Sequence, residues 1–382
     1  MLRKFALLLI VAVFALSLCG CSSFIDVRLR LVVHAIGIDP VDEDVYEMSW
    51  QVFKAQPPEG GGPVDATGQN IITITTYGRS VYEALKSLER QTGKEVFIGD
   101  MELIVLGSDF AGKDISGLMS YFYDDCDIYM GMNVVLADGK ASEITGMSLE
   151  HGTAVAELLN EMVYVCAKES RTIPSKLIDV GSHFKSGNTS FVMPVLSAKP
   201  LENSGGGGDD TTVYDKAVGV FKTALISNGT PSGYISPEEA KGICLLVGRA
   251  QSVMMVIPQG DELVVAEASI TKVKRKATIG ENGFPLIKVE IMGELKVKDD
   301  PCGKGHKDIK ELSQDELFKY CRLAYQKTAA AGTDVLDIER LLKKYENRYY
   351  SENSRNIEAI VQNTAFEVNV NLKKYTDDTN RR

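Results

Sequence analysis

The residues best suited to covalent chemistry lie at the end of the first apolar stretch of the chain. Two basic residues are followed by an apolar run from Phe5 to Leu16, and a small residue, Gly20, directly precedes Cys21. The run is shorter than the ~20 residues that cross a bilayer as a helix. This layout predicts a secretory signal peptide over residues 1–20 rather than a spanning helix.

The position of Cys21 resembles the lipobox of bacterial lipoproteins. The resemblance implies that the thiol carries diacylglycerol as a thioether, that the signal is cut between Gly20 and Cys21, and that the new amine is acylated, for example with palmitate. Two or three chains at ~0.8 kcal/mol per buried methylene hold a protein stably on a membrane. Cys19 offers no second site, because Leu18 before it is too large. The alternative is an ordinary cleaved signal in which Cys21 is incidental.

Length and composition describe a globular, acidic protein. A chain of 382 residues is long enough for about two or three domains, and 44% apolar with 25% charged residues is typical of folded proteins. The formal net charge of −10 becomes more negative when Arg3 and Lys4 leave with the signal. An acidic surface argues against nucleic acid and does not favour anionic lipid. Membrane attachment is therefore expected to depend on the lipid and on protein partners.

The other cysteines and histidines suggest no reactive site. The remaining cysteines are odd in number and widely spaced, without Cys-x-x-Cys, so we expect buried small hydrophobes rather than a disulfide framework; they are Cys126, Cys166, Cys244, Cys302 and Cys321. Cys302 and His306 would be only half of a metal site. The glycines at 205–208 lack the Lys-Ser/Thr of a phosphate loop, and neither a zinc helix nor a Gly-x-Ser-x-Gly elbow occurs. We expect no catalytic residue, metal or cofactor.

Two clusters allow a functional as well as a structural interpretation. The run Lys272–Lys276 could contact lipid headgroups or an acidic partner loop, or could be the solvated end of an alternating strand. Three tyrosines, Tyr121, Tyr123 and Tyr129, lie near aspartates and could line an amine pocket through cation–π contacts. Ordinary packing is the alternative for the tyrosines.

Three stretches rich in glycine, proline and aspartate divide the chain: Gln56–Pro63, Glu202–Asp210 and Asp299–Lys307. The middle stretch is the best boundary, because glycine and aspartate favour a flexible linker. We therefore expect an N-terminal α+β region over 21–201, a linker over 202–212 and a C-terminal α+β region over 213–376.

Strand and helix signals alternate along both regions. Three sequences have the form of a capping box, beginning at Ser80, Ser236 and Ser313. The predicted helices are 81–92, 116–123, 153–168, 237–246, 313–330 and 335–349. The predicted strands are 32–53 (with a turn), 71–77, 102–107, 131–138, 217–222, 263–276, 284–298 and 366–372. The pair 263–276 and 284–298 is expected to be antiparallel with one wet face, and the last strand to join a sheet.

The order of these motifs resembles the Ger(x)C family of spore germination lipoproteins, the C subunits of nutrient germinant receptors. Together they span nearly the whole mature chain. The matching segments are His34–Asp39, Tyr46–Gln51, Gly78–Ala84, Ile98–Gly107 with Asp109–Ala111, Gly219–Lys222, Gly233–Ser236 with Glu239, and Asp334–Leu336. The chain departs from the family in having Phe24 and Asp26–Arg28 where members often carry Trp and a charged run, and in its long glycine linker.

The resemblance implies three α+β domains of mixed sheets and packed helices, preceded by the lipoprotein signal. It also implies a non-catalytic subunit on the outer face of the spore inner membrane, beside a transporter-like and a channel-like integral-membrane subunit. The nutrient would bind the transporter-like partner.

Two other functions remain open at this point. One is a solute-binding lipoprotein of a transporter, which would have two α/β lobes with parallel sheets; the long antiparallel pair at 263–298 argues against it. The other is a lipid-anchored cell-wall hydrolase, whose paired carboxylates or metal ligands would come together only in the fold.

Overall fold

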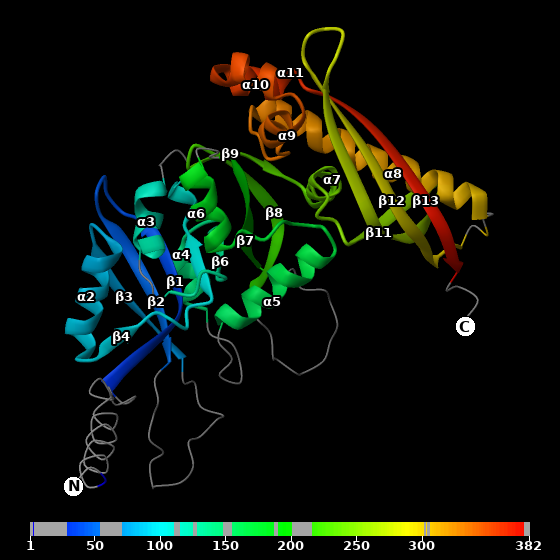
Figure 1. The fold of residues 1–382 in the computed structure, drawn as a ribbon. Coiled ribbons are helices and arrows are strands. Elements are labelled where there is room, and N and C mark those ends of the chain that lie inside the picture. Colours follow the sequence, from blue (N-terminus) through cyan, green and yellow to red (C-terminus); the bar gives the residue numbers. More distant parts are fainter. Residues whose placement is uncertain are drawn as a thin grey trace.

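The computed structural model describes Arg3 and residues 29–53, 71–110, 115–124, 128–147, 155–186, 190–200, 216–301, 303 and 306–377. Within them the chain forms a mixed α+β structure with two sheets (Figure 1), which confirms the predicted fold class. Gly20, Cys21 and the predicted linker 202–212 lie outside the described residues.

The first sheet has the strand order β3-β2-β1-β5-β6-β7-β8-β9, with β4 also pairing β1. Its centre is parallel from β1 through β5 and β6 to β7, and both ends are antiparallel. The strands are β1 (Arg30–Pro40), β2 (Tyr46–Phe53), β3 (Ile71–Gly78), β4 (Glu95–Phe97), β5 (Leu103–Leu106), β6 (Asn133–Ala137), β7 (Phe191–Pro200), β8 (Lys216–Ser227) and β9 (Thr230–Ile235).

Helices cover both faces of this sheet, so its central strands are buried on both sides. One apolar cluster lies under α2 (Val81–Thr92), α3 (Ser116–Asp124) and α6 (Leu177–Ser186). A second lies under α4 (Ala141–Thr145) and α5 (Val155–Lys168). Alternate residues of β5 enter the two clusters, as the twofold period of a strand requires. A short 3₁₀ helix, Ser108–Phe110, follows β5.

The second sheet is smaller and has the order β10-β11-β12-β13. Its strands are β10 (Ser252–Gln259), β11 (Glu262–Ile279), β12 (Pro285–Asp299) and β13 (Ala365–Asp377). Strands β11 and β12 are antiparallel, and β12 alternates buried and exposed residues. The predicted pair with one wet face is confirmed, and the last strand joins the sheet parallel to β12.

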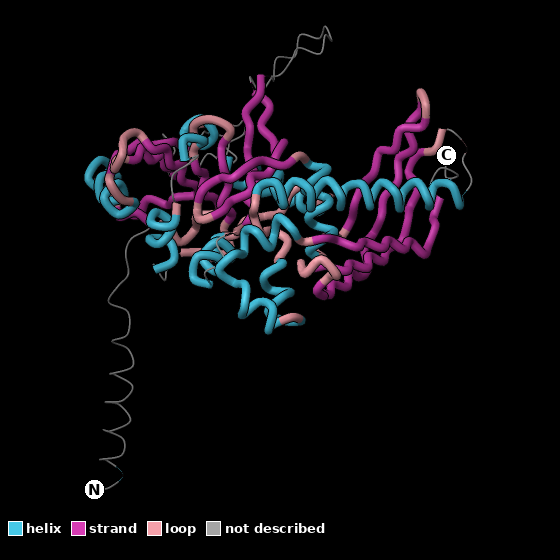
Figure 2. Tube along the Cα trace, turned by 90° about the horizontal axis from the view of Figure 1, so that it is seen from above, coloured by secondary structure: helices cyan, strands magenta, loops and turns pink. Residues whose placement is uncertain are grey.

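The helices of the second region are α7 (Pro237–Val247), α8 (His306–Ala331), α9 (Ile338–Tyr345), α10 (Asn347–Asn353) and α11 (Ile357–Asn363), with a 3₁₀ turn at Ser354–Asn356. The long α8 runs along the second sheet (Figure 2), and α7 and α9 share its apolar cluster.

The strands on the two sides of the predicted linker pair with each other. Lys199 opposes Ala217 and Pro200 opposes Lys216 in the β7–β8 register, so β8 and β9 belong to the first sheet. The passage to the second sheet comes later, at α7, between β9 and β10. The division of the chain at 202–212 stays a prediction.

Two of the three predicted helix starts are correct. Ser236 and Glu239 form a complete capping box at α7. At α2, the Ser80 side chain accepts from the Glu83 N–H, but the Glu83 carboxylate accepts from the Arg79 N–H instead of that of Ser80.

The start predicted at Ser313 is wrong, because α8 begins at His306 and Ser313 lies within it. Ser313 is fully buried on the same stripe as Ile309 and Leu317. The apolar period therefore continues before the serine, which makes it a small core residue and not a cap. The single helix predicted over 335–349 is also wrong: it is broken at Glu346 into α9 and α10.

Gly242 should be sensitive to any side chain, because α7 and α8 cross there at backbone distance. A Cβ atom at Gly242 would lie 2.0 Å from the Tyr320 carbonyl oxygen and 2.7 Å from the Ala324 Cβ. We expect Gly242→Ala to lower the free energy of unfolding by about 2 kcal/mol or more, as overpacking does, measured by chemical denaturation.

Gly117→Ala is the matched control. Gly117 lies in the first turn of α3, and nothing lies within 4 Å of its Cβ position. There the substitution should be neutral or stabilise by about 0.5 kcal/mol. Equal effects of the two substitutions would contradict a close α7–α8 crossing.

Candidate functional site

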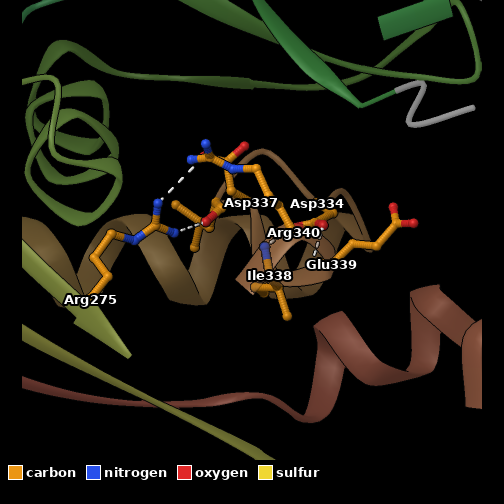
Figure 3. A network of polar contacts seen from close by, with 7 residues as sticks. Arg275, Asp334, Asp337, Ile338, Glu339 and Arg340 are labelled. Carbon is orange, nitrogen blue, oxygen red and sulfur yellow. Dashed lines mark hydrogen bonds and ion pairs between the residues drawn. The ribbon is translucent and has the colours of Figure 1, made fainter. Parts of the chain in front are cut away.

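Asp334 lies in the turn between α8 and α9 and is almost fully buried. Its Oδ1 accepts a hydrogen bond from the Ile338 N–H at 2.7 Å, and its Oδ2 accepts one from the Glu339 N–H at 2.9 Å (Figure 3). These N–H groups belong to the first turn of α9, which has no intrahelical partners for them. Asp334 therefore caps α9 from outside the helix.

Arg275 of β11 completes the network (Figure 3). Its guanidinium forms an ion pair with Asp337 at 3.4 Å and donates to the Leu336 carbonyl. Arg340 binds the same Asp337 Oδ2 at 2.6 Å, but from solvent: its side chain is 71% exposed, against 9% for Arg275. Burial lowers the pKa of Arg275, and the neighbouring Asp337 opposes the shift. The network fixes the α8–α9 turn to Arg275 of β11 in the second sheet.

A cleft of about 50 Å³ lies beside this network. Its lining includes Asp334 and Asp337 of the second region together with His183 of α6 and Phe191 of β7. The His183 ring stacks on Phe191 with centroids 5.3 Å apart. The network and cleft therefore lie at the junction of the two sheets.

A second buried aspartate, Asp39, has the same role in the first sheet. Its carboxylate accepts from the N–H groups of Ala141 at 2.7 Å and Ser142 at 2.9 Å, in the first turn of α4. A Cβ at Gly107 would lie 2.0 Å from Asp39 Oδ1, so the absence of a side chain there leaves room for the carboxylate.

The arrangement of the two buried aspartates is suited to holding elements of the fold together. Both aspartates use their oxygens on backbone donors. In the described part of the chain, no three His, Cys, Asp or Glu side chains gather in a way that could hold a metal. No helix of the described residues is long and apolar enough to span a membrane.

The other residues singled out by the sequence lie partly in the cores and partly on the surface. Cys244 and Cys321 are buried, as predicted, and burial raises the pKa of each thiol to about 12; Cys166 is half-buried. Tyr121 and Tyr123 pack against the core, whereas Tyr129 is 58% exposed.

Two families match the chain in succession. The spore germination protein N-terminal domain matches residues 25–198, and the spore germination B3/GerAC-like C-terminal domain matches residues 222–373. The chain belongs to the GerAC-like family of spore germination proteins.

A solved structure shares the fold. The crystal structure of the GerBC protein aligns with a TM-score of 0.54 over 90% of this chain and 97% of that one, at 15% identity. A complex of Era with a nucleotide and ribosomal RNA was also found, but its TM-score of 0.15 does not indicate a common fold. No curated protein sequence matches the chain.

Both capping aspartates lie in segments that carry the family resemblance, His34–Asp39 and Asp334–Leu336. The structure gives these segments a physical role, because each supplies a carboxylate that accepts hydrogen bonds from the backbone N–H groups at a helix start. Sequence analysis missed Arg275 as the partner of Asp337. The run Lys272–Lys276 was visible, but nothing in it shows that Arg275 alone turns inward to a residue 62 positions away.

Arg275 should contribute more to stability than Arg340, although both bind Asp337. Removing one member of a buried ion pair costs about 3–5 kcal/mol, whereas exposed pairs contribute about 1 kcal/mol or less. Since Arg340 still neutralises Asp337, we expect Arg275→Met to cost about 3 kcal/mol and Arg340→Met less than about 1 kcal/mol. Denaturant unfolding of both variants tests this, and a larger loss for Arg340→Met would contradict it.

Asp334 should make stability depend on pH. Burial raises its pKa from 3.8 to about 6, although the two backbone N–H bonds oppose the shift. A carboxyl whose pKa is higher in the folded state stabilises fully below its unfolded pKa, and this contribution is lost as the pH rises through the folded value.

We therefore compare the wild type with Asp334→Asn, whose side chain cannot ionise. As the pH rises from about 4 to about 7, the free energy of unfolding of the wild type should fall by ~3 kcal/mol relative to that of the variant. Asp334→Asn itself should be less stable at acid pH, because its amide cannot accept both N–H bonds. Denaturation of both proteins across this range gives the difference directly. A difference independent of pH would show that Asp334 does not titrate there.

Proposed function

We propose that the mature chain is a lipid-anchored, non-catalytic subunit of a nutrient germinant receptor. The family match carries the spore germination role. Its first matched residue, 25, lies four positions after Cys21, so the family-like part begins close to the end of the predicted signal. Lipidation of Cys21 would hold the protein on the outer face of the spore inner membrane, beside integral-membrane subunits that bind the nutrient.

The small number of residues between Cys21 and strand β1 supports this proposal. Strand β1 begins at Arg30, and the residues between can span no more than about 30 Å even when fully extended. An anchor at Cys21 would therefore confine the first sheet to a thin layer above the membrane and raise its effective concentration near membrane partners.

The two other functions gain no support from the structure. A solute-binding lipoprotein would have two lobes built on parallel sheets, whereas β10, β11 and β12 form an antiparallel series. A hydrolase would bring paired carboxylates or metal ligands together in a cleft. The two aspartates at the junction, Asp334 and Asp337, are instead engaged by backbone N–H groups and by arginines.

Cys21→Ala tests the proposal in spores of the source organism. We expect the protein to be lost from the inner-membrane fraction and germination to fail for one class of nutrient in a panel, while other nutrients still act. Loss is expected because the acyl chains on Cys21 are the membrane attachment that this proposal assigns to the chain.

Cys19→Ala is the matched control, because Cys19 leaves with the signal and should change neither readout. Full membrane retention of Cys21→Ala with normal germination would refute the lipid anchor. Retention with failed germination would show that partner subunits, and not the lipid, hold the protein in place.

A further inference from the structure

One edge of β11 has no strand neighbour over its second half. Strand β10 pairs with β11 only as far as Ser269, and the last backbone bond on that side joins the Ile270 N–H to the Gln251 carbonyl. From Lys272 to Ile279, β11 pairs with β12 alone in the described part of the chain. Such an edge presents unpaired N–H and C=O groups that can accept another strand.

A bulge at Thr271 determines which residues of β11 point to each face of the sheet. The β11–β12 register shifts between Ile270 and Lys272, and a bulge of this kind reverses the sides to which successive residues point. Beyond it the lysines at 272, 274 and 276 are exposed, whereas Val273 and Arg275 are partly buried beside α9. The run of basic residues is therefore split between two faces of one strand.

An open groove of about 760 Å³ lies between this edge and α9. Six of its lining residues are basic and one, Glu290, is acidic. The basic residues are Lys274, Arg275, Lys276, Lys288, Arg340 and Lys344. Val273, Leu341 and Tyr345 add apolar surface on the α9 side. This concentration of positive charge stands on a protein whose net charge is −10.

The charges of the groove are not balanced within the protein. Lys274 pairs with Glu290 at 3.0 Å and Lys288 with Glu367 at 3.0 Å. Lys276 lies directly opposite Lys288 in the sheet, an arrangement that destabilises antiparallel strands. Neither Lys276 nor Lys344 has a carboxylate partner among the described residues.

We propose that the free edge of β11 binds an extended, acidic segment of a partner protein as an added strand. Alternate side chains of such a strand are ~6.8 Å apart, the spacing of Lys274 and Lys276 on β11. Outward carboxylates would meet these lysines, and inward apolar side chains would meet Val273 and Leu341. Backbone hydrogen bonds supply affinity in this mode, and side chains supply specificity.

A second copy of the chain fits the edge poorly, because pairing two β11 edges would bring the same lysines together. A membrane surface fits poorly as well. Strand β1, the element nearest to Cys21, begins at the opposite end of the molecule from the β11–β12 turn (Figure 1). The inference goes beyond the proposed receptor role and does not depend on lipidation of Cys21.

A labelled peptide in which glutamate alternates with valine tests the proposal against the full chain in detergent micelles. Fluorescence anisotropy gives the affinity, and hydrogen exchange reports protection of the amides between Lys272 and Ile279. We expect binding with protection there. Lys274→Glu combined with Lys276→Glu should weaken binding about tenfold or more, as loss of complementary charge does. Lys307→Glu with Lys310→Glu on α8 makes the same charge change away from the groove and should have no effect.

Two further peptides decide whether strand addition or charge alone is responsible. A peptide of the same composition with its glutamates in one block, and one with alternate amides N-methylated, should both bind at least tenfold more weakly. Equal binding of either, or an equal loss in the α8 variant, would overturn the proposal. So would absence of binding by the alternating peptide, or protection of these amides that appears only on phosphatidylglycerol vesicles and not with the peptide.

Discussion

The close crossing of α7 and α8 holds the two sheets in one body. Helix α7 connects β9 of the first sheet to β10 of the second, and every residue from Ala240 to Leu246 is buried. Gly242 lets the Tyr320 backbone approach, while Lys241 donates to the Met254 carbonyl at 2.8 Å. A helix buried all round must satisfy every neighbour at once, so α7 helps to fix the position of the second sheet.

Two buried aspartates stabilise the starts of short helices inside the fold. Asp39 and Asp334 each bring a carboxylate to N–H groups that would otherwise lack partners. Because a helix N-terminus carries positive partial charge, this placement offsets part of the cost of burial. It also ties segments far apart in sequence, since Asp39 reaches α4 across 102 residues. Both aspartates lie in segments that carry the resemblance to the family.

Much of the secondary structure follows from the sequence alone. The N-cap at Ser80, the capping box at Ser236, the alternation in β12 and the apolar stripes of α2 and α5 depend on neighbours within a few residues. The start predicted at Ser313 failed for a tertiary reason. Ser313 has the sequence of a cap, but the burial of Ile309 and Leu317 against the sheet extends α8 past it, because tertiary packing of an apolar stripe outweighs a local hydrogen bond.

The family, the mixed α+β class and the prediction that Cys21 is lipidated follow from the sequence, because they depend on local motifs and their order. Three features became visible in the fold alone: β8 and β9 join the first sheet, Arg275 turns inward to Asp337, and β11 is left with a free basic edge. Each of these is a contact between distant segments or the absence of one. Spacing along a chain does not encode such contacts; they are set by which surfaces must be buried together.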